Sequence, residues 1–300
     1  MSIRGEAARP KILILGATGS IGGLTAAALD SMNVDLVRAS QRPDVVTKWR
    51  EAGRSAVHLD LEDPRTYASA LANVERLFIL TGYTINMVHQ TKTIVDAAQD
   101  AGVGFLVHLG VFSNGRSTDP HTSWHELVES YIRASGIAWC NIHPHIFMDT
   151  ILGWISDRKL TYPLGGTASG WIANEDIAAI SSQVLADGPE HHAGKELFLS
   201  TELLDGAAII DRINMRLGGG FLVEPMTPDD LLASVDSGET SLPANLEPYY
   251  ARSVIEWARH VWDGRLAYTS ITTNTVETML GRPPIGLDQW IDRNKEALLC

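Results

Sequence analysis

Short apolar runs alternate, over the first half of the chain, with stretches whose apolar residues recur every three or four positions. A short apolar run is typical of a strand buried on both faces, and the longer spacing is typical of an amphipathic helix. The pattern predicts strands at residues 11–15, 34–39, 55–59, 76–80, 104–109 and 137–142. It predicts helices that begin near residue 20, at 66–72, at about 86–101 and at 123–136.

Strands that alternate with helices in this way are joined by right-handed crossovers and form a parallel sheet. The fold class we expect is therefore α/β, with a Rossmann-type doubly wound parallel sheet. A ligand of such a sheet lies beyond the carboxyl ends of the strands. We expect residues 1–155 to form the dinucleotide-binding core. Residues 156–300 should complete the sheet and add a mostly helical substrate-binding region, all within one compact unit.

In the second half of the chain the pattern predicts a helix capped by Asn174, a strand at 195–200 and a helix at 205–217. Residues 246–268 are rich in aromatic side chains. Four apolar residues of this segment fall on one helical face: Tyr250, Val254, Trp257 and Val261. That face either packs in the core, which we favour, or forms a flat wall for an aromatic substrate.

The loop after the first predicted strand has three glycines with the spacing G-x-x-G-x-x-G. A Cβ at these positions would block the tight turn, the approach of a diphosphate or the packing of helix on strand. The helix that follows has a regular apolar face, and the free N–H groups at its start suit a diphosphate. Because the glycines lie between an apolar strand and an amphipathic helix, we predict a dinucleotide site. Its residues are Gly16, Thr18, Gly19, Ser20, Ile21 and Gly22.

The end of the second predicted strand indicates which dinucleotide binds. An acidic residue there would bind a free ribose 2′-hydroxyl, whereas an arginine accepts a 2′-phosphate. No carboxylate lies at this strand end, where Ser40 and Arg42 are found, and Asp44 comes only after a proline. Arg42 can form charge-assisted bonds to a phosphate, and a solvated loop charge is the alternative, so the sequence favours NADP(H) over NAD(H). Later loops add further candidate cofactor contacts at Asp60, Leu61, Thr81, Gly82 and His143.

The loop after the fifth predicted strand is long, and long loops in compact domains are often functional. Ser123 and Glu126 have the spacing of a capping box, which places His125 in the first turn of the next helix. A helix N-terminus disfavours imidazolium, so we expect a neutral His125 that either donates to the acceptor or lines the pocket. Tyr83 is the second candidate catalytic residue, with core packing as the alternative. Candidate substrate contacts are Phe112, Ser113, His121, Phe147 and Trp154.

Composition excludes several classes of function. Of the 300 residues 45% are hydrophobic, yet no apolar run reaches the roughly 18 residues of a membrane-spanning helix. The net charge of −12 argues against nucleic acid as a partner, because phosphate neutralisation needs basic surface. Cys140 and Cys300 form no disulfide framework, and His143 and His145 lack a third metal ligand, so no metal is expected. The first ten residues lack the apolar core of a signal peptide, and we expect a cytoplasmic monomer or homodimer.

Six stretches of the chain form a combination typical of a known family. They are GATGSIG at 16–22, QRP at 41–43, HLDLEDP at 58–64, WHELVESYIRASGIAWCNIHPHIF at 124–147, WIANEDIAAI at 171–180 and LGRPPIGLDQW at 280–290. Together they resemble the NmrA-like branch of the atypical short-chain dehydrogenases, over nearly the whole chain. The resemblance implies a seven-stranded Rossmann sheet, with a small substrate-binding region built mainly from the C-terminal half. The family includes quinone, azo-dye and triphenylmethane-type reductases, plant phenylpropanoid reductases and catalytically silent redox-sensing regulators.

One position departs from the family pattern. Many members carry a lysine on the helix after the fifth strand, four residues before a glutamate, and the position that matches before Glu129 is His125. The tyrosine-x-x-x-lysine pair of typical short-chain dehydrogenases is also absent, since no tyrosine of this chain has a lysine four residues later. The proton-transfer chemistry of those enzymes therefore cannot be carried over.

The function that the sequence favours is an NADPH-dependent reductase of a small, aromatic or conjugated acceptor such as a quinone, imine, enone or dye. Hydride chemistry resides in the cofactor, and such acceptors need less help from a protein acid than an unactivated ketone does. The alternative is a regulator that binds NADP(H) and a protein partner without turnover, which has no need of the long loop with His121 and His125. An epimerase or dehydratase is disfavoured by the missing tyrosine–lysine pair.

Overall fold

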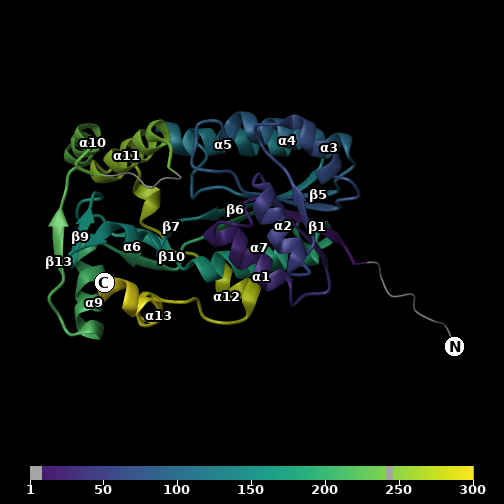
Figure 1. The fold of residues 1–300 in the computed structure, drawn as a ribbon. Helices are drawn as coiled ribbons and strands as arrows, with labels where there is room; N and C mark the ends of the chain where they lie inside the picture. The colour runs from purple at the N-terminus through teal and green to yellow at the C-terminus, as the bar shows by residue number, and fades with distance from the viewer. Residues whose placement is uncertain (1–8, 241–245, 300) are drawn as a thin grey trace.

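The Rossmann-type parallel sheet expected from the sequence is present and has seven strands (Figure 1). The computed structural model describes residues 9–240 and 246–299, so Cys300 lies outside the described residues. All neighbouring strands of this sheet are parallel, and the order reverses between β1 and β4. From one edge to the other, the strands are β11 (Lys195–Leu199), β6 (Ala138–Pro144), β5 (Phe105–Leu109), β4 (Arg76–Ile79), β1 (Lys11–Ile14), β2 (Asp35–Ser40) and β3 (Ala56–His58).

Helices cover both faces of this sheet (Figure 1). Alternate residues of a strand point to opposite faces, and the central strands are buried on both. On β5, Phe105 and Val107 join the core beneath α1 and α7, whereas Leu106 joins the core beneath α4 and α5. One face carries η1 (Pro64–Thr66), α3 (Tyr67–Ala70), α4 (Met87–Asp100) and α5 (Pro120–Ala134), and the other carries α1 (Ser20–Leu29), α2 (Pro43–Glu51) and α7 (Asn174–Asp187).

A second lobe lies beyond the carboxyl ends of the strands and contains two small three-stranded sheets (Figure 1). Its core surrounds Trp171 and Trp290, which are fully buried. Its strands are β7 (Ile146–Phe147), β8 (Ile155–Ser156), β9 (Lys159–Tyr162), β10 (Ser169–Ile172), β12 (Glu202–Leu204) and β13 (Leu222–Pro225). Its helices are α6 (Thr150–Trp154), α9 (Gly206–Leu217), α10 (Pro228–Ser237), α11 (Pro248–Trp262) and α13 (Leu287–Leu299).

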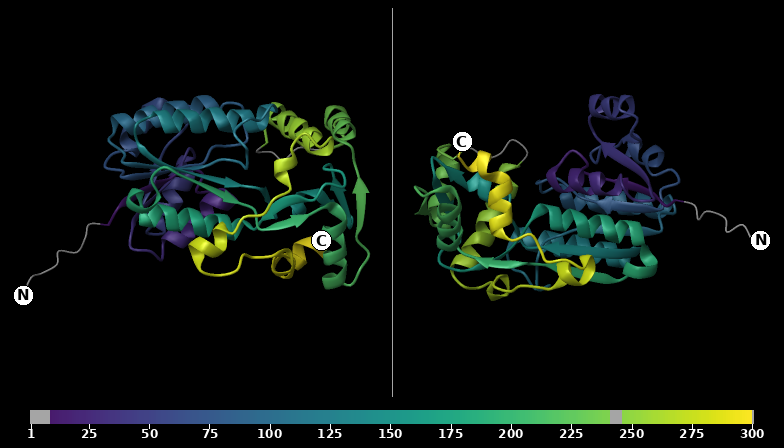
Figure 2. Two further views of the ribbon diagram at one scale, coloured as in Figure 1. Left: turned by 180° about the vertical axis from the view of Figure 1, so that it is seen from behind. Right: turned by 90° about the horizontal axis from the view of Figure 1, so that it is seen from below.

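The C-terminal segment ties the two lobes together (Figure 2). After α11 and η2 (Ala267–Thr269) the chain returns to the edge of the large sheet, where α12 (Thr275–Leu280) packs against α7 and β11. It then goes back to the second lobe and places α13 against α9. Thr273 fixes this crossing, since its backbone N–H donates to the carbonyl of Ser200 at 2.7 Å and its hydroxyl donates to that of Phe198 at 2.8 Å. The short helix α8 (Pro189–His192) connects α7 to β11.

The predicted start of α5 is wrong. The helix begins at Pro120, and its N-cap is Asp119, whose carboxylate accepts a hydrogen bond from the backbone N–H of Thr122 at 2.8 Å. An acidic N-cap accepts one of the free N–H groups at the start of the helix, and the proline that follows has no N–H. The helix can therefore begin before the capping-box pair Ser123 and Glu126. Ser123 is therefore inside the helix, and His125 lies in its second turn instead of its first.

Two further details of the helices also differ from the prediction. The N-cap of α7 is Ala173, while the Asn174 side chain is buried and donates to Asp149 at 2.6 Å. The apolar spacing of Ile21, Leu24, Ala28 and Met32 predicts a longer helix with Leu24 on its buried face, but α1 ends at Leu29 and Leu24 is exposed. The small residue Gly22 is buried against the backbone of the glycine loop, so α1 packs closer to this loop than a larger side chain would allow.

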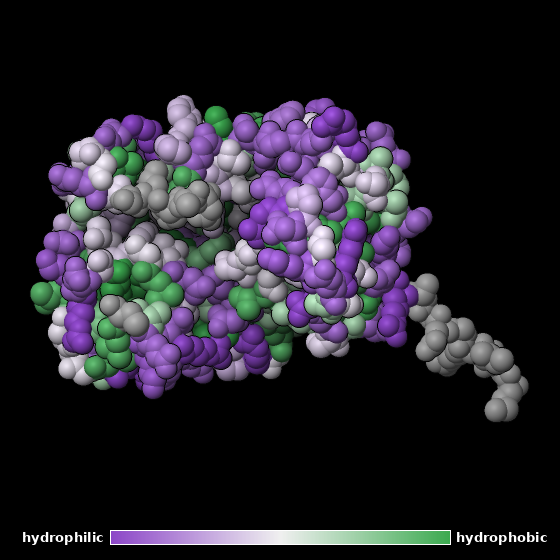
Figure 3. All heavy atoms as spheres, in the orientation of Figure 1, coloured by the Kyte–Doolittle hydropathy of each residue, from purple (hydrophilic) through white to green (hydrophobic). Residues whose placement is uncertain are grey.

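The aromatic face of α11 packs in the core, as the favoured interpretation of the sequence predicts. Tyr250 and Val261 are buried, and Val254 and Trp257 pack against the same two apolar clusters. None of the helices within residues 9–240 and 246–299 combines the length and apolarity needed to cross a membrane. On the face shown in Figure 3, the apolar side chains gather mainly over the second lobe.

Candidate functional site

The glycine loop joins β1 to α1 at the point where the strand order reverses. Gly16 has a φ of +65°, and a Cβ placed on it would lie 2.2 Å from the Cδ2 atom of Leu80 at the end of β4. A Cβ on Gly22 would lie 2.2 Å from the carbonyl oxygen of Gly16. These two glycines are therefore required by the turn and by the close packing of α1 on the strand, with or without a ligand.

Gly19 differs from the other two glycines of the loop. Its Cβ would meet only the Gly16 carbonyl oxygen, at 3.3 Å, and Thr18, Gly19 and Ser20 are all exposed. The first N–H groups of α1 have no intrahelical acceptor, and its first turn contains no acidic side chain. The space over Gly19 and the unshielded helix end therefore fit the diphosphate of a dinucleotide, which needs close approach to backbone N–H groups.

The ends of β2 and β3 lie beside this loop in the sheet. Ser40 is the last residue of β2, and its hydroxyl accepts a hydrogen bond from the backbone N–H of Arg42 at 3.2 Å. Arg42 is exposed at the start of α2, and no carboxylate of the described residues pairs with it. After β3, Asp60 turns the chain by accepting from the N–H of Glu62 at 3.0 Å, and Leu61 is half-buried.

The loop after β4 is held by the segment that precedes α11. The carbonyl of Tyr83 accepts from the backbone N–H of Glu247 at 3.0 Å, and the N–H of Ile85 donates to the Glu247 carboxylate at 2.8 Å. Thr81 and Gly82, predicted as cofactor contacts, belong to this loop, which joins β4 to α4. The Tyr83 side chain is 46% exposed, and its ring centroid lies 5.7 Å from that of Tyr250.

The two candidate catalytic residues belong to one cluster of aromatic and histidine rings. Tyr83 contacts Tyr250, whose ring centroid lies 5.3 Å from that of His121. The His121 ring in turn lies 5.4 Å from that of His125, and the His125 ring lies 6.2 Å from that of His108 on β5. His125 is 7% exposed, and neither of its ring nitrogens has a hydrogen-bond partner among the described residues.

These histidines are neutral at pH 7, although not for the reason the sequence suggested. Burial lowers the pKa of His108 to about 3 and that of His121 to about 4. Burial also lowers the pKa of His125 well below its ordinary value, and the neighbouring His121, His108 and His143 add to the effect. Desolvation by the surrounding core, with His125 in the second turn of α5, replaces the helix dipole as the main cause.

The candidate substrate contacts lie in three regions: the long loop, the second lobe and the ring cluster. Ser113 folds the long loop, since its hydroxyl donates to the Glu126 carboxylate and accepts from the N–H of Gly115. Phe112 is buried against His145 and Phe198, with ring centroids 4.8 Å and 5.3 Å apart. Phe147 is half-buried on β7 and Trp154 packs edge-on against Trp171 in the second lobe, whereas His121 lies in the ring cluster.

A row of polar side chains crosses three strands on the face covered by α5. His108 of β5 is in register with Asn141 of β6, and Asn141 is in register with Glu196 of β11. His143 lies two residues further along β6 and is 3% exposed. Buried polar groups are costly in a sheet that is otherwise apolar, so this row calls for a functional explanation.

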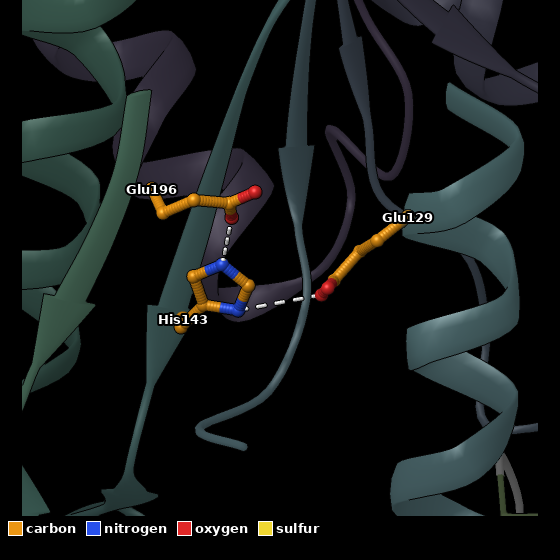
Figure 4. Close-up of side chains that lie close together, drawn as sticks. All are labelled: Glu129, His143 and Glu196. Atoms are coloured by element: carbon orange, nitrogen blue, oxygen red, sulfur yellow. Dashed lines mark hydrogen bonds and ion pairs between the residues drawn. The ribbon is translucent and has the colours of Figure 1, made fainter. Parts of the chain in front are cut away.

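Glu129 of α5 and Glu196 hold His143 from both sides (Figure 4). The His143 Nε2 atom donates to the Glu196 carboxylate, and Nδ1 lies 3.1 Å from the Val111 carbonyl and 3.3 Å from Glu129 Oε1. Burial alone would lower the pKa of His143, but the bonds to Glu129 and Glu196 outweigh it and raise the pKa to about 9. His143, predicted as a cofactor contact, thus has both ring nitrogens engaged by the protein.

Glu129, His143 and Glu196 offer ligand atoms that all lie within 4.8 Å of one another, close enough for a cation. The same carboxylates already have a cationic partner, because Arg133 Nη1 lies 2.7 Å from Glu196 and 3.8 Å from Glu129. With His143 protonated, the two carboxylates face two positive charges. We therefore interpret the group as an ion cluster.

Sequence reasoning missed His108, Glu129 and Glu196 as members of the site. The signals were present but weak: a histidine within the apolar run FLVHL, and a glutamate within KELFL. Their meaning depends on the register of three strands that lie up to 88 residues apart, between His108 and Glu196. That register is not encoded in any local motif.

Comparisons with known proteins agree with this fold. A family model described as the NmrA-like family matches residues 8–247. An NAD(P)H azoreductase from Xenophilus azovorans is 26% identical over 212 residues, which cover 69% of this chain and 74% of the azoreductase. The structure of the Citrobacter sp. triphenylmethane reductase complexed with NADP(H) is similar, with a TM-score of 0.80 and 17% identity, covering 94% of this chain and 99% of that one. An NADPH-dependent quinone oxidoreductase from Escherichia coli, complexed with NADPH, gives a TM-score of 0.81 and 19% identity with the same coverage, 94% and 99%.

Proposed function

The chain belongs to the NmrA-like family, and from this premise we propose that it is an NADPH-dependent reductase of a small aromatic or conjugated acceptor. The observation that carries the proposal is the glycine loop: the fold requires Gly16 and Gly22, while Gly19 leaves room above the first turn of α1. A diphosphate is the ligand that such a helix end accommodates. Bound NADPH would supply the hydride, and the chain supplies position, shelter from water and a proton.

The preference for NADPH rests on Arg42. This arginine follows the end of β2 with no carboxylate partner among the described residues, and a free guanidinium can hold a 2′-phosphate with two parallel bonds. The azoreductase relative is named for NAD(P)H, and the two solved structures hold NADP(H) or NADPH. Asp60, Leu61, Thr81 and Gly82 complete the proposed cofactor contacts at the ends of β3 and β4.

The proposed acceptor site lies beside the cluster of aromatic and histidine rings. His125 is the group that we assign to the acceptor, because it is buried and neutral, and neither of its ring nitrogens has a hydrogen-bond partner among the described residues. A neutral imidazole donates a proton from one nitrogen while it accepts one at the other. Tyr83 lies at the exposed end of the same cluster, where its ring can cover a flat acceptor.

The test is the oxidation of NADPH, followed at 340 nm, with a panel of quinones, imines, enones, azo dyes and triphenylmethane dyes. We expect turnover with at least one of these acceptors and a lower KM for NADPH than for NADH. Tight binding of NADPH without turnover of any acceptor would contradict the proposal and favour the regulator of the NmrA type. Absence of NADPH binding would contradict the cofactor assignment itself.

A further inference from the structure

Reduction of a neutral acceptor, such as a quinone, imine, enone or azo compound, by a hydride donor also consumes a proton, and the proposed donor His125 is buried. In this reaction the acceptor and NADPH take up one proton to give the two-electron-reduced acceptor and NADP⁺. The candidate donor His125 is 7% exposed, so the proton it gives must be replaced through the protein or through the mouth of the site. The row of buried polar groups extends from His108 on β5, next to His125, to Glu196 on β11, the edge strand of the sheet.

The outer end of this row opens to solvent. Glu196 lines an open groove of about 750 Å³ at the edge of the sheet, beside Phe198, Thr273 and Glu277. The Glu196 side chain is 30% exposed, whereas the side chains of His143 and Glu129 are only 4% and 5% exposed. Glu196 therefore connects the interior of the row with water.

The middle of the row consists of titratable groups that lie close together. Glu196 accepts from His143 Nε2, and His143 Nδ1 lies 3.3 Å from Glu129 Oε1. A Cβ on Gly110 would lie 2.4 Å from Glu129 Oε1 and 3.5 Å from His108 Nδ1, so these two atoms converge above the same glycine. His108 Nδ1 is buried, with no hydrogen-bond partner among the described residues.

The inner end of the row reaches the proposed proton donor. The ring centroids of His108 and His125 lie 6.2 Å apart, a separation that a bridging water can span. Besides Glu129, the charged and titratable groups that face His143 are Arg133 of α5, Glu196 of β11 and His108 of β5.

We propose that Glu196, His143, Glu129 and His108 conduct protons from the groove at β11 to His125, which passes them to the acceptor. The proposal rests on the proposed reductase function. In the step at the acceptor, one N–H bond of His125 breaks and an O–H or N–H bond of the acceptor forms as the hydride arrives. The other ring nitrogen of His125 takes a proton from the side of His108, and Glu129, His143 and Glu196 restore it from solvent.

Two glutamates of the groove provide a matched pair for the test. Glu196→Gln removes the carboxylate that contacts His143, whereas Glu277→Gln changes a carboxylate that lines the same groove. We expect Glu196→Gln to lower kcat roughly tenfold and to raise the solvent deuterium isotope effect, with little change in KM or NADPH affinity. Imidazole in the buffer should restore part of the rate, and Glu277→Gln should behave as the wild type.

A second variant leaves every charge in place. Gly110→Ala puts a Cβ where Glu129 Oε1 and His108 meet and should push the carboxylate aside, with the same effect on kcat and on the isotope effect. A readout without turnover is the NMR titration of the histidines in the protein alone. There the pKa of His143 should fall in Glu196→Gln and stay unchanged in Glu277→Gln, because only Glu196 contacts its ring.

The possible outcomes separate the two proposals. A wild type that turns over no acceptor contradicts the reductase function, and the proton path with it. An active wild type whose kcat, pH profile and solvent isotope effect are unchanged by both Glu196→Gln and Gly110→Ala overturns the path alone. A loss of kcat that only follows the loss of folded protein, with an unchanged isotope effect, shows that Glu196 is structural and also overturns it.

Discussion

The glycine loop and the polar row form two parts of one proposed site, and they are built in opposite ways. The loop acts through backbone N–H groups and through missing side chains, all within residues 16–22. The row acts through side chains of β5, β6, β11 and α5, which are brought together only when the sheet forms. The loop is exposed at Gly19, whereas His108 and His143 are 1% and 3% exposed.

This difference shows how each part tolerates change. A cofactor loop made of backbone is insensitive to the identity of most side chains but cannot accept added volume. A buried row of polar groups accepts little loss of charge or partner, since an unpaired buried group costs about 1–3 kcal/mol. Added volume should therefore disable the loop, whereas the row should be sensitive to any change that removes a charge or displaces a partner.

The largest effect is expected from added volume at Gly19. A Cβ there meets only the Gly16 carbonyl oxygen at 3.3 Å, so Gly19→Val should remain folded but fill the space of the diphosphate. We expect the affinity for NADPH to fall by roughly a thousandfold, about 4 kcal/mol, measured by calorimetry. Gly22→Ala is the contrasting variant, because its Cβ would lie 2.2 Å from the Gly16 carbonyl oxygen and should lower the free energy of unfolding itself. A folded Gly19→Val variant with unchanged NADPH affinity would contradict the cofactor site.

The same contrast explains how far the sequence could predict the molecule. The strands and the glycine loop are local, since apolar runs and glycine spacing directly reflect burial on both faces and tight turns. All seven predicted strands of the large sheet are present, and Arg42 and Ser40 lie at the strand end where they were expected. The sequence does not predict the two small sheets of the second lobe, because their strands are short and, apart from the local pair β8–β9, join segments far apart in the chain.

The polar row shows more clearly what the sequence alone cannot predict. The sequence points to His125 but attributes its neutrality to the helix end. The main cause is burial, and two of the neighbours that add to it, His108 of β5 and His143 of β6, come from other elements. The sequence assigns His143 to the cofactor because it lies at the carboxyl end of a predicted strand. Its pairing with Glu196 depends on the adjacent strand β11, which follows more than fifty residues later in the chain.

The second largest effect concerns the dependence of stability on pH. The pKa of His143 is raised to about 9 in the folded protein from the ordinary value of 6.5. Its stabilising contribution is therefore complete below pH 6.5 and is lost as the pH rises through 9, by about 3 kcal/mol at most. Burial lowers the pKa of His108, His121 and His145, so these residues act in the opposite sense and destabilise the fold as the pH falls below 6.5.

The free energy of unfolding should thus pass through a maximum near pH 6.5, measurable by urea titration from pH 5 to 9.5. In Glu196→Gln the decrease on the alkaline side should be smaller, because His143 has lost one carboxylate partner. A wild type with constant stability between pH 6.5 and 9.5 would show that His143 is not held as a cation.

A third prediction concerns His125, the proposed proton donor at the inner end of the polar row. His125→Ala should reduce turnover by about a hundredfold if the imidazole donates to the acceptor, while NADPH affinity should hardly change. His125→Gln separates the two roles, since an amide can line the pocket but cannot relay a proton. Turnover and NADPH affinity, measured for both variants with two acceptors of different bulk, distinguish a proton donor from a residue that only lines the pocket. Full activity of His125→Ala with both acceptors would remove His125 from the mechanism and leave Tyr83 as the residue to test.

The smallest effect is expected at Arg42, where a side chain, and not the backbone, should distinguish NADPH from NADH. Its guanidinium is exposed and has no carboxylate partner among the described residues, so its removal leaves no buried charge behind. Charge-assisted hydrogen bonds are worth about 1.5–3 kcal/mol, and Arg42→Ala should therefore weaken NADPH binding roughly ten- to a hundredfold. NADH binding should be unchanged, because NADH lacks the 2′-phosphate.

Both affinities can be measured in one titration series. The control is Arg54→Ala, which changes an exposed arginine that precedes β3. Equal losses for NADPH and NADH would show that Arg42 does not contact the 2′-phosphate, and the preference for NADPH would then have to come from the backbone of the loop.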